Sequence, residues 1–252
     1  MAVPTLTATH HRTVAVLLSA PRLAPYLRAA GGNVRAALAL YQWNVEMSSA
    51  VYKMLHLVEV FLRNAIDAEL RVWNATQIDP RTGRTHDADW LMDPSRLVER
   101  VVRREEIDKA LRRATLAVKD SSTGPRPVTH DDVLAQLMFG TWRFMLPSKD
   151  PGRRFLWRST ISRAFPHLDR PVSDLVRDID GLYRLRNRIA HLEPLLPGGA
   201  VVKRHLRATR RVLAAVDPAV AQWLVSHQTV STVITEMPVP VPEMPEGPHS
   251  EN

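Results

Sequence analysis

The sequence predicts an all-α protein, and three observations support this fold class. Only ten of the 252 residues are glycine, whereas alanine, leucine, valine and arginine recur throughout the chain. Few glycines allow few tight turns, and alanine, leucine and arginine favour helices. Residues 34–74 contain no proline or glycine and carry apolar residues at helical spacing. We therefore expect a helical protein with this long segment near its centre.

Turn and capping residues set the boundaries of the expected helices. Pro21 suits the first turn of a short helix at 21–30, which a pair of glycines ends, and Asn33 suits the N-cap of the long helix at 34–74. The chain from 75 to 95 is expected to be a polar connection rich in turns. Later helical patterns span 96–119, 155–165, 171–193 and 201–231, and the last of these has a break at Pro218. Another helix is expected between 119 and 155, with Thr129 as its cap and Pro147 at its end.

Composition indicates the general class of protein. We expect an N-terminal segment at 1–20 with no clear helical pattern, one helical domain at 21–232, and a disordered proline-rich tail at 233–252. The chain has no cysteine, which removes thiolate nucleophiles, disulfides and thiolate metal sites. No apolar run approaches the roughly 20 residues of a membrane helix, and no signal peptide is evident. A cytoplasmic protein without a membrane association, cofactor or metal is expected.

The charge of the chain suggests a polyanionic partner. The formal net charge is +8 and the sequence pI is about 10.4, and arginine contributes much more than lysine. Guanidinium groups bind phosphates through two hydrogen bonds and stay charged at every relevant pH. RNA is therefore a plausible partner, although arginine enrichment from a GC-rich genome explains the composition equally well.

The long helix presents two neighbouring rows of apolar or small residues, so we expect it to be covered on more than one side. The first row is Leu38, Tyr41, Val45, Ser48, Tyr52, Leu55, Leu62 and Ile66, and the second is Val51, Met54, Val58, Phe61, Ala65, Ala68 and Val72. Glu59 interrupts the first row. A carboxylate there needs a cation, and two interpretations stay open: a local ion pair with Arg63, or a group in which Glu59, Arg63 and Asn64 orient functional side chains elsewhere.

A cluster of three arginines and a histidine lies at 183–194, inside the helix expected from Pro171. At about 100° per residue, Asn187 and His191 are about 40° apart on the helix, and Arg184 lies within about 20° of the histidine. Arg188 is about 60° away, and Arg186 is about 140° away on a long side chain. Several cations can therefore converge near one imidazole.

Such a group suits metal-independent RNA cleavage, in which the ribose 2′-hydroxyl attacks the adjacent phosphorus. Histidine transfers protons near neutral pH, arginine neutralises charge on the phosphate, and an amide holds either group in place. A two-fold dimer would supply two histidines. The opposing interpretation is structural: a histidine at the edge of the core, with arginines paired to Asp178, Asp180 and Glu193.

The segment LRNRIAHLEP at 185–194 resembles the signature of Abi-like proteins, the abortive-infection family related to AbiD and AbiF, in the HEPN superfamily. Arg186, Asn187 and His191 match its shared pattern of an arginine, a polar residue and a later histidine. Other landmarks occur in the same order, namely LYQWN at 40–44, EVFLRNAI at 59–66, LMFGTW at 137–142, LW at 156–157 and FP at 165–166. The resemblance covers about residues 23–196.

This resemblance implies a HEPN-type helical bundle with extra helices, a homodimer with a composite site, and endoribonuclease activity in phage defence or as a toxin. Arg186, Asn187 and His191 would be catalytic, Arg184 and Arg188 would contact RNA phosphates, and Glu59, Arg63 and Asn64 would support them. Family members often carry a second histidine where this chain has Leu192. Because some HEPN proteins bind RNA without cutting it, a non-catalytic RNA-binding or regulatory protein, or one with an antitoxin partner, is the alternative.

Overall fold

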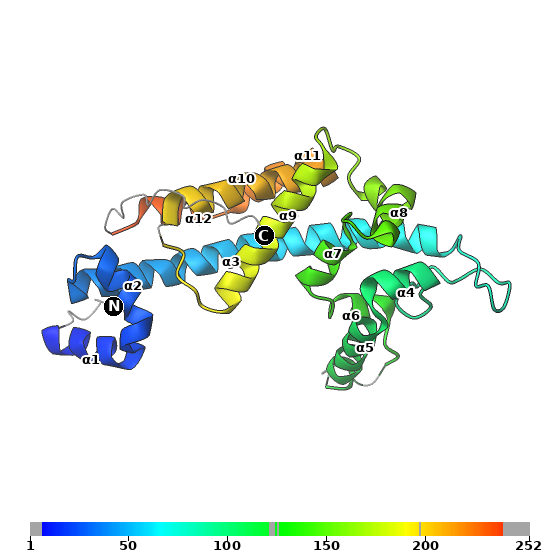
Figure 1. Cartoon of the computed structure of the whole chain (residues 1–252). Helices are drawn as coiled ribbons and strands as arrows, with labels where there is room; N and C mark the ends of the chain where they lie inside the picture. Colours follow the sequence, from blue (N-terminus) through cyan, green and yellow to red (C-terminus); the bar gives the residue numbers. More distant parts are fainter. Residues whose placement is uncertain (1–6, 121–123, 125, 197, 239–252) are drawn as a thin grey trace. The chain divides into compact units, whose positions relative to one another are not determined.

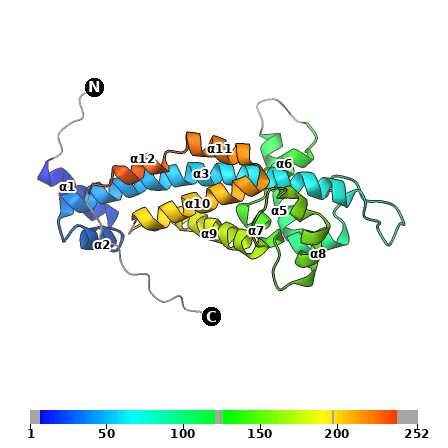
Figure 2. The same ribbon diagram turned by 90° about the horizontal axis from the view of Figure 1, so that it is seen from above.

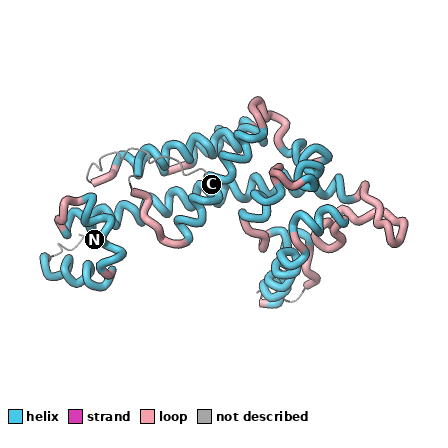
Figure 3. Tube along the Cα trace, in the orientation of Figure 1, coloured by secondary structure: helices cyan, strands magenta, loops and turns pink. Residues whose placement is uncertain are grey.

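The computed structural model describes residues 7–120, 124, 126–196 and 198–238. These residues form α-helices and one short 3-10 helix, and their only β pairing is a single bridge between Ile78 and Thr85. The all-α prediction is confirmed (Figure 3). In chain order the elements are α1 (Ala8–Leu18), α2 (Ala20–Ala29), α3 (Val34–Asn74), α4 (Arg96–Val102), α5 (Arg104–Lys119), α6 (His130–Leu134), α7 (Phe139–Met145), α8 (Pro151–Ser159), η1 (Ile161–Ala164), α9 (Val172–Ala190), α10 (Gly198–Val216), α11 (Pro218–His227) and α12 (Val230–Thr235) (Figure 1).

The chain divides into two compact units, which we call the first and second units. The first unit contains Met1–His56, Arg184–Ala208 and Leu224–Asn252, and the second contains Leu57–Tyr183 and Thr209–Trp223. Four helices, α3, α9, α10 and α11, contribute residues to both units.

In the first unit, α2 packs against the beginning of α3. The buried residues Leu23 and Tyr26 of α2 form a cluster with Ala37 and Leu40 of α3. Near the C-terminal end of the sequence, α12 lies along the same part of α3 (Figure 2). The indole nitrogen of Trp43 donates a 2.7 Å hydrogen bond to the carbonyl of Val233 in α12. The first part of α3 is therefore the common support of this unit.

The second unit is tied together by buried polar contacts between distant segments. His130 of α6 lies between two carboxylates, with Nε2 2.8 Å from Oδ1 of Asp67 and Nδ1 2.7 Å from Oδ1 of Asp89. The indole nitrogen of Trp90 donates to the same oxygen of Asp67 at 2.8 Å. These bonds join α3, the connection after it and α6.

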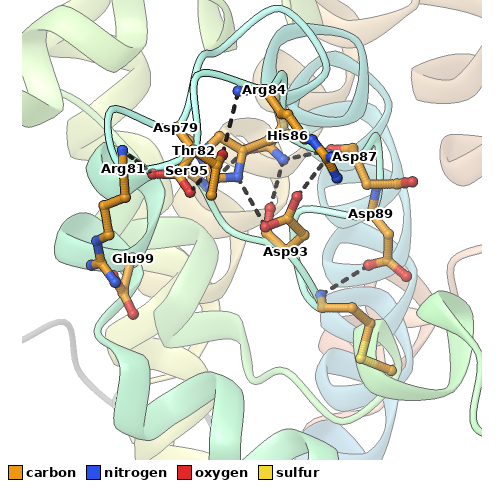
Figure 4. A network of polar contacts seen from close by, with 12 residues as sticks. Asp79, Arg81, Thr82, Arg84, His86, Asp87, Asp89, Asp93, Ser95 and Glu99 are labelled. Carbon is orange, nitrogen blue, oxygen red and sulfur yellow. Dashed lines mark hydrogen bonds and ion pairs between the residues drawn. The ribbon is translucent and has the colours of Figure 1, made fainter.

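The connection between α3 and α4 is ordered by its own acids (Figure 4). Asp93 accepts a 2.8 Å hydrogen bond from the backbone of Asp87 and lies 2.9 Å from Nδ1 of His86. The buried side chain of Asn74 donates to the carbonyls of Asp87 and Asp93. A polar connection was expected here, and these bonds give it one conformation.

Several expected boundaries agree with the structure. The long helix spans Val34–Asn74, and the side chain of Asn33 accepts a 3.0 Å hydrogen bond from the backbone of Ala36, as an N-cap does. Thr129 and Asp132 form a capping box at the start of α6.

Three expected helices are wrong because each is broken. The helix expected at 155–165 is divided into α8, which ends at Ser159, and the 3-10 helix η1, and two others are each divided into two α-helices. The 96–119 segment breaks at Arg103, whose φ is 69°, and the segment after Thr129 breaks between α6 and α7. In both of these α-helix pairs, the last buried apolar residue of the first helix lies five positions before a buried apolar residue of the second. These residues are Val102 and Ile107 at the first break, and Leu134 and Phe139 at the second. Five positions correspond to about 140° on a continuous helix, so the second residue would face away from the core. The break lets both be buried.

Three smaller expectations also differ. Residues 8–18, where no helical pattern was expected, form α1, which begins with a capping box made by Thr7 and His10. Residues 233–235 of the expected disordered tail belong to α12, and residues 239–252 lie outside the described residues. The helix expected to run to Glu193 ends at Ala190.

Candidate functional site

The motif residues lie at the C-terminal end of α9, in the first unit. Arg186 and Asn187 are half-buried and His191 is exposed. The helix ends at Ala190, so His191 occupies its C-cap and is not inside the helix as predicted, although its backbone N–H still donates to the carbonyl of Asn187 at 2.9 Å. The imidazole therefore follows the arginine and the amide by about one helical turn.

The end of α9 is a Schellman cap. The N–H of Glu193 donates to the carbonyl of Arg188, and the N–H of Leu192 donates to the carbonyl of Ile189, both at 2.9 Å. Leu192 supplies the left-handed residue, with φ 56°. This geometry turns the chain sharply after His191 and explains why the helix stops before Pro194.

The three motif side chains are available for a ligand, whereas Arg188 is engaged. Within the part of the chain that the structure describes, no residue forms a side-chain hydrogen bond or ion pair with Arg186, Asn187 or His191. Arg188 in contrast lies 3.3 Å from a carboxylate oxygen of Glu193 and donates to the carbonyl of Pro194 at 2.6 Å. Its guanidinium stabilises the cap, which limits the phosphate contact predicted for it.

The loop that follows His191 is anchored to α2 and α3. Arg22 of α2 donates from Nη1 to the carbonyl of Leu192. The side-chain oxygen of Asn44 accepts a 2.7 Å hydrogen bond from the backbone of Leu195, and both of these residues are buried. Because the chain is held at 192 and 195, the position of His191 depends on these contacts.

Sequence analysis missed His205 of α10, another histidine of the first unit. Its Nδ1 lies 2.8 Å from the carbonyl of Val201 and therefore carries the proton, which leaves Nε2 as an acceptor. Burial lowers the pKa of His205, and the nearby cations Arg204, Arg188 and Arg184 lower it further, against the hydrogen bond to Val201. His205 is thus a half-buried neutral imidazole in an electropositive environment.

Exposed cations of α9 and α10 contribute to that environment. Arg184 is exposed on α9, and Lys203, Arg204 and Arg207 are exposed around His205 on α10. The basic run KRHLR at 203–207 is the sequence signal that would have identified His205. Together these residues give the first unit a surface suited to an anionic ligand.

The three residues predicted to support the motif lie in the second unit. Glu59 and Arg63 are half-buried and Asn64 is exposed, so Glu59 is less buried than its place in the apolar row suggested. Nε of Arg63 donates to the side-chain oxygen of Asn64 at 3.1 Å. Their support of the motif stays a prediction.

These observations define an all-α protein with a basic first unit and an exposed histidine at a capped helix end. Among the described residues no cluster of three or more histidine, aspartate or glutamate side chains is arranged as a metal site. None of the described helices combines the length and apolar character needed to cross a membrane. Comparison of the chain with family models, curated proteins and solved structures found no match.

Proposed function

We propose that the protein is a metal-independent endoribonuclease. The observation that carries this proposal is the availability of Arg186, Asn187 and His191, which lie within about one turn at the end of α9 and are not engaged by any described side chain. The resemblance of 185–194 to the Abi-like signature supports the same assignment. No other part of the described chain combines an exposed histidine with this sequence pattern.

The proposed reaction is a transesterification. The ribose 2′-oxygen attacks phosphorus, its proton passes to a base, and the bond from phosphorus to the 5′-oxygen breaks as that oxygen is protonated. His191 serves in this proton transfer, Arg186 binds the scissile phosphate and its developing charge, and Asn187 positions them. The products are a 2′,3′-cyclic phosphate and a 5′-hydroxyl.

The reaction requires a base and an acid, so a second group must complement His191. A homodimer would supply a second copy of the same histidine at a composite site. His205 is an alternative source within one chain, because its neutral Nε2 can accept a proton at pH 7. Sizing the protein in solution separates these sources: a monomer that still cuts RNA would favour His205.

We place this activity in the cytoplasm, in phage defence or as a growth-arresting toxin, where an antitoxin or another regulatory partner would restrain it. The second candidate function is RNA binding without cleavage. The engagement of Arg188 by Glu193 and Pro194 favours this alternative, because it removes one cation from the set available to a transition state.

The test is incubation of the purified protein with total RNA in excess EDTA. The wild type should cut, and His191→Ala should lose about 100-fold or more of the rate, the usual contribution of a proton-transfer group. His167→Ala replaces an exposed histidine of the second unit and is the matched control. Intact RNA with the wild type, or equal cutting by His191→Ala, overturns the proposal.

Arg186 is tested against an arginine of the same helix. Arg177 is exposed and pairs with Asp174 at 2.8 Å, so Arg177→Ala changes the net charge equally without touching the motif. Arg186→Ala should reduce cleavage severely and Arg177→Ala only slightly. Equal losses would mean that Arg186 contributes general positive charge and no specific phosphate contact.

A further inference from the structure

A pocket of about 370 Å³ lies in the first unit beside the end of α9. Its lining comes from α2, α3, α9 and the cap residue, and includes Tyr26, Tyr41, Tyr52, Lys53, Ile189 and Leu192. The volume falls within the range of about 300–1,000 Å³ typical of sites for small organic groups. The pocket is therefore large enough to hold a flat heterocycle.

The pocket follows the apolar row of α3 that was expected to be core. From Tyr41 to Tyr52 this row is not fully covered, because Val45 is 43% exposed and Tyr52 is 51% exposed. Residues of the second row at the same level, such as Val51 and Met54, are fully buried. An exposed valine and tyrosine one above the other along this part of α3 mark a surface that can bind an apolar face.

Aromatic rings supply much of this lining. Tyr26 and Tyr41 pack edge to face with centroids 5.2 Å apart and an interplanar angle of 70°, which fixes both rings. Tyr52 lies about three turns of α3 beyond Tyr41 and is the most exposed of the three. Tyrosine rings are the stacking platforms on which proteins bind unpaired RNA bases.

The charge of the lining suits a nucleotide. Among the described residues of the lining, the only ionic side chain is that of Lys53, and burial raises the pKa of Tyr26 to about 12, so that this hydroxyl stays neutral. Arg22 adds a second cation at the carbonyl of Leu192. An anionic sugar phosphate attached to a bound base would meet cations and no carboxylate of the lining.

The pocket also adjoins the proposed catalytic histidine. Ile189 and Leu192 line it, and His191 directly precedes Leu192, so the two Cα atoms are about 3.8 Å apart. A base held against Ile189 and Leu192 would keep its ribose and phosphate near the end of α9.

We propose that this pocket binds one unpaired base of the RNA substrate and sets the base preference of cleavage. The inference rests on the proposed function for the identity of the ligand as RNA. Tyr52 stacks on the base, Lys53 contacts the attached phosphate, and the rigid pair Tyr26 and Tyr41 closes the pocket.

The test measures binding and does not depend on cleavage. Binding of each of the four nucleoside 5′-monophosphates to the full chain is compared with binding of ribose 5-phosphate, in EDTA and in the His191→Ala background. At least one nucleotide should bind much more tightly than the sugar phosphate. Tyr52→Ala should weaken that binding by about 5- to 150-fold, as expected for the loss of one stacking contact.

Two further variants make the result specific. Tyr52→Phe keeps the ring and should recover most of the lost affinity. Leu116→Ala removes an exposed apolar side chain of α5 in the second unit and should have no effect. Equal binding of nucleotides and ribose 5-phosphate, or unchanged binding by Tyr52→Ala in a folded protein, overturns the inference.

The failure of this inference is distinguishable from the failure of the proposed function. If nucleotides bind through Tyr52 but wild-type protein leaves RNA intact, the pocket is supported and the nuclease is not. If wild-type protein cuts RNA but Tyr52→Ala changes neither nucleotide binding nor the bases at the cut sites, the nuclease is supported and the pocket is overturned.

Discussion

At the scale of single residues, Leu192 determines where α9 ends. It adopts φ 56° without being glycine, is 69% exposed, and closes the Schellman cap after His191. A left-handed conformation costs an ordinary residue about 1–2 kcal/mol, whereas glycine adopts it freely. The unfavourable conformation thus occurs at the residue that directly follows the proposed catalytic histidine.

Leu192→Gly should therefore raise the free energy of unfolding by about 1 kcal/mol, since the side chain loses little burial. Leu192→Val is the control and should lower it, because a branched side chain is worse in this conformation. Denaturant titration of both variants measures the difference. A stability order with valine above glycine would contradict the strain assigned to this position.

The ionisation of His130 should affect the stability of the second unit. Burial acts to lower its pKa, but hydrogen bonds to Asp67 and Asp89 outweigh burial and raise the pKa. Both ring nitrogens face carboxylates at 2.7 and 2.8 Å, and both can donate only in the charged form. The stabilisation is thus fully present below the unfolded pKa of about 6.5 and is lost as pH rises through the raised folded pKa.

His130→Gln should lower the stability of the second unit by about 3 kcal/mol at pH 6, because it breaks a buried ionic contact. The difference from wild type should shrink as pH rises above the folded pKa. Thermal melts from pH 5.5 to 9 measure it, with His167→Gln as an exposed control. A difference that does not vary with pH would show that His130 is held as a neutral imidazole.

At the scale of elements, the proposed site depends on the attachment of one loop to one helix. The oxygen of Asn44 on α3 accepts from the N–H of Leu195 at 2.7 Å in a buried environment. An unsatisfied buried N–H costs about 1–3 kcal/mol. This bond therefore fixes the chain just after the cap of α9.

Asn44→Ala should destabilise the first unit by about 1–3 kcal/mol and reduce RNA cleavage, since the loop after His191 loses an anchor. Hydrogen exchange at the amide of Leu195 reports the loosening directly. Gln42→Ala, at an exposed position on the same helix, is the control. Unchanged exchange at Leu195 would mean that other contacts hold the loop.

Much of the helical pattern could be predicted because local signals determine it. The bounds of α3 follow from the Asn33 cap and from the absence of proline and glycine. The break at Arg103 could not be predicted in this way, because no glycine or proline marks it and only the five-residue spacing of buried residues indicates it.

In the candidate site too, the features set by local sequence could be predicted, and those set by contacts between distant segments could not. The motif at 186–191 is local and was identified from the sequence, but His191 was placed inside the helix because Leu192 is an unusual cap residue. His205 lies on another helix and its environment depends on Arg184 and Arg188, so only the folded chain brings them together. The contacts of His130 likewise join residues far apart in the sequence.

At the scale of the whole molecule, the net charge is +8, and arginines of the two units differ in whether they form ion pairs. In the second unit, arginines form ion pairs with aspartates, such as Arg126 with Asp132, Arg170 with Asp178 and Arg211 with Asp178. In the first unit, Arg186 has no such partner among the described residues. These three arginines of the second unit are held in ion pairs, whereas Arg186 of the first unit is available to a polyanion.

The most direct test of the account compares one RNA oligonucleotide with its 2′-O-methyl counterpart, in EDTA, with wild-type and His191→Ala protein. The account predicts that the wild type cuts only the unmodified RNA, leaving 2′,3′-cyclic phosphate and 5′-hydroxyl ends, and that His191→Ala leaves both strands intact. Cutting of the methylated strand, or equal cutting of the RNA by His191→Ala, would contradict it.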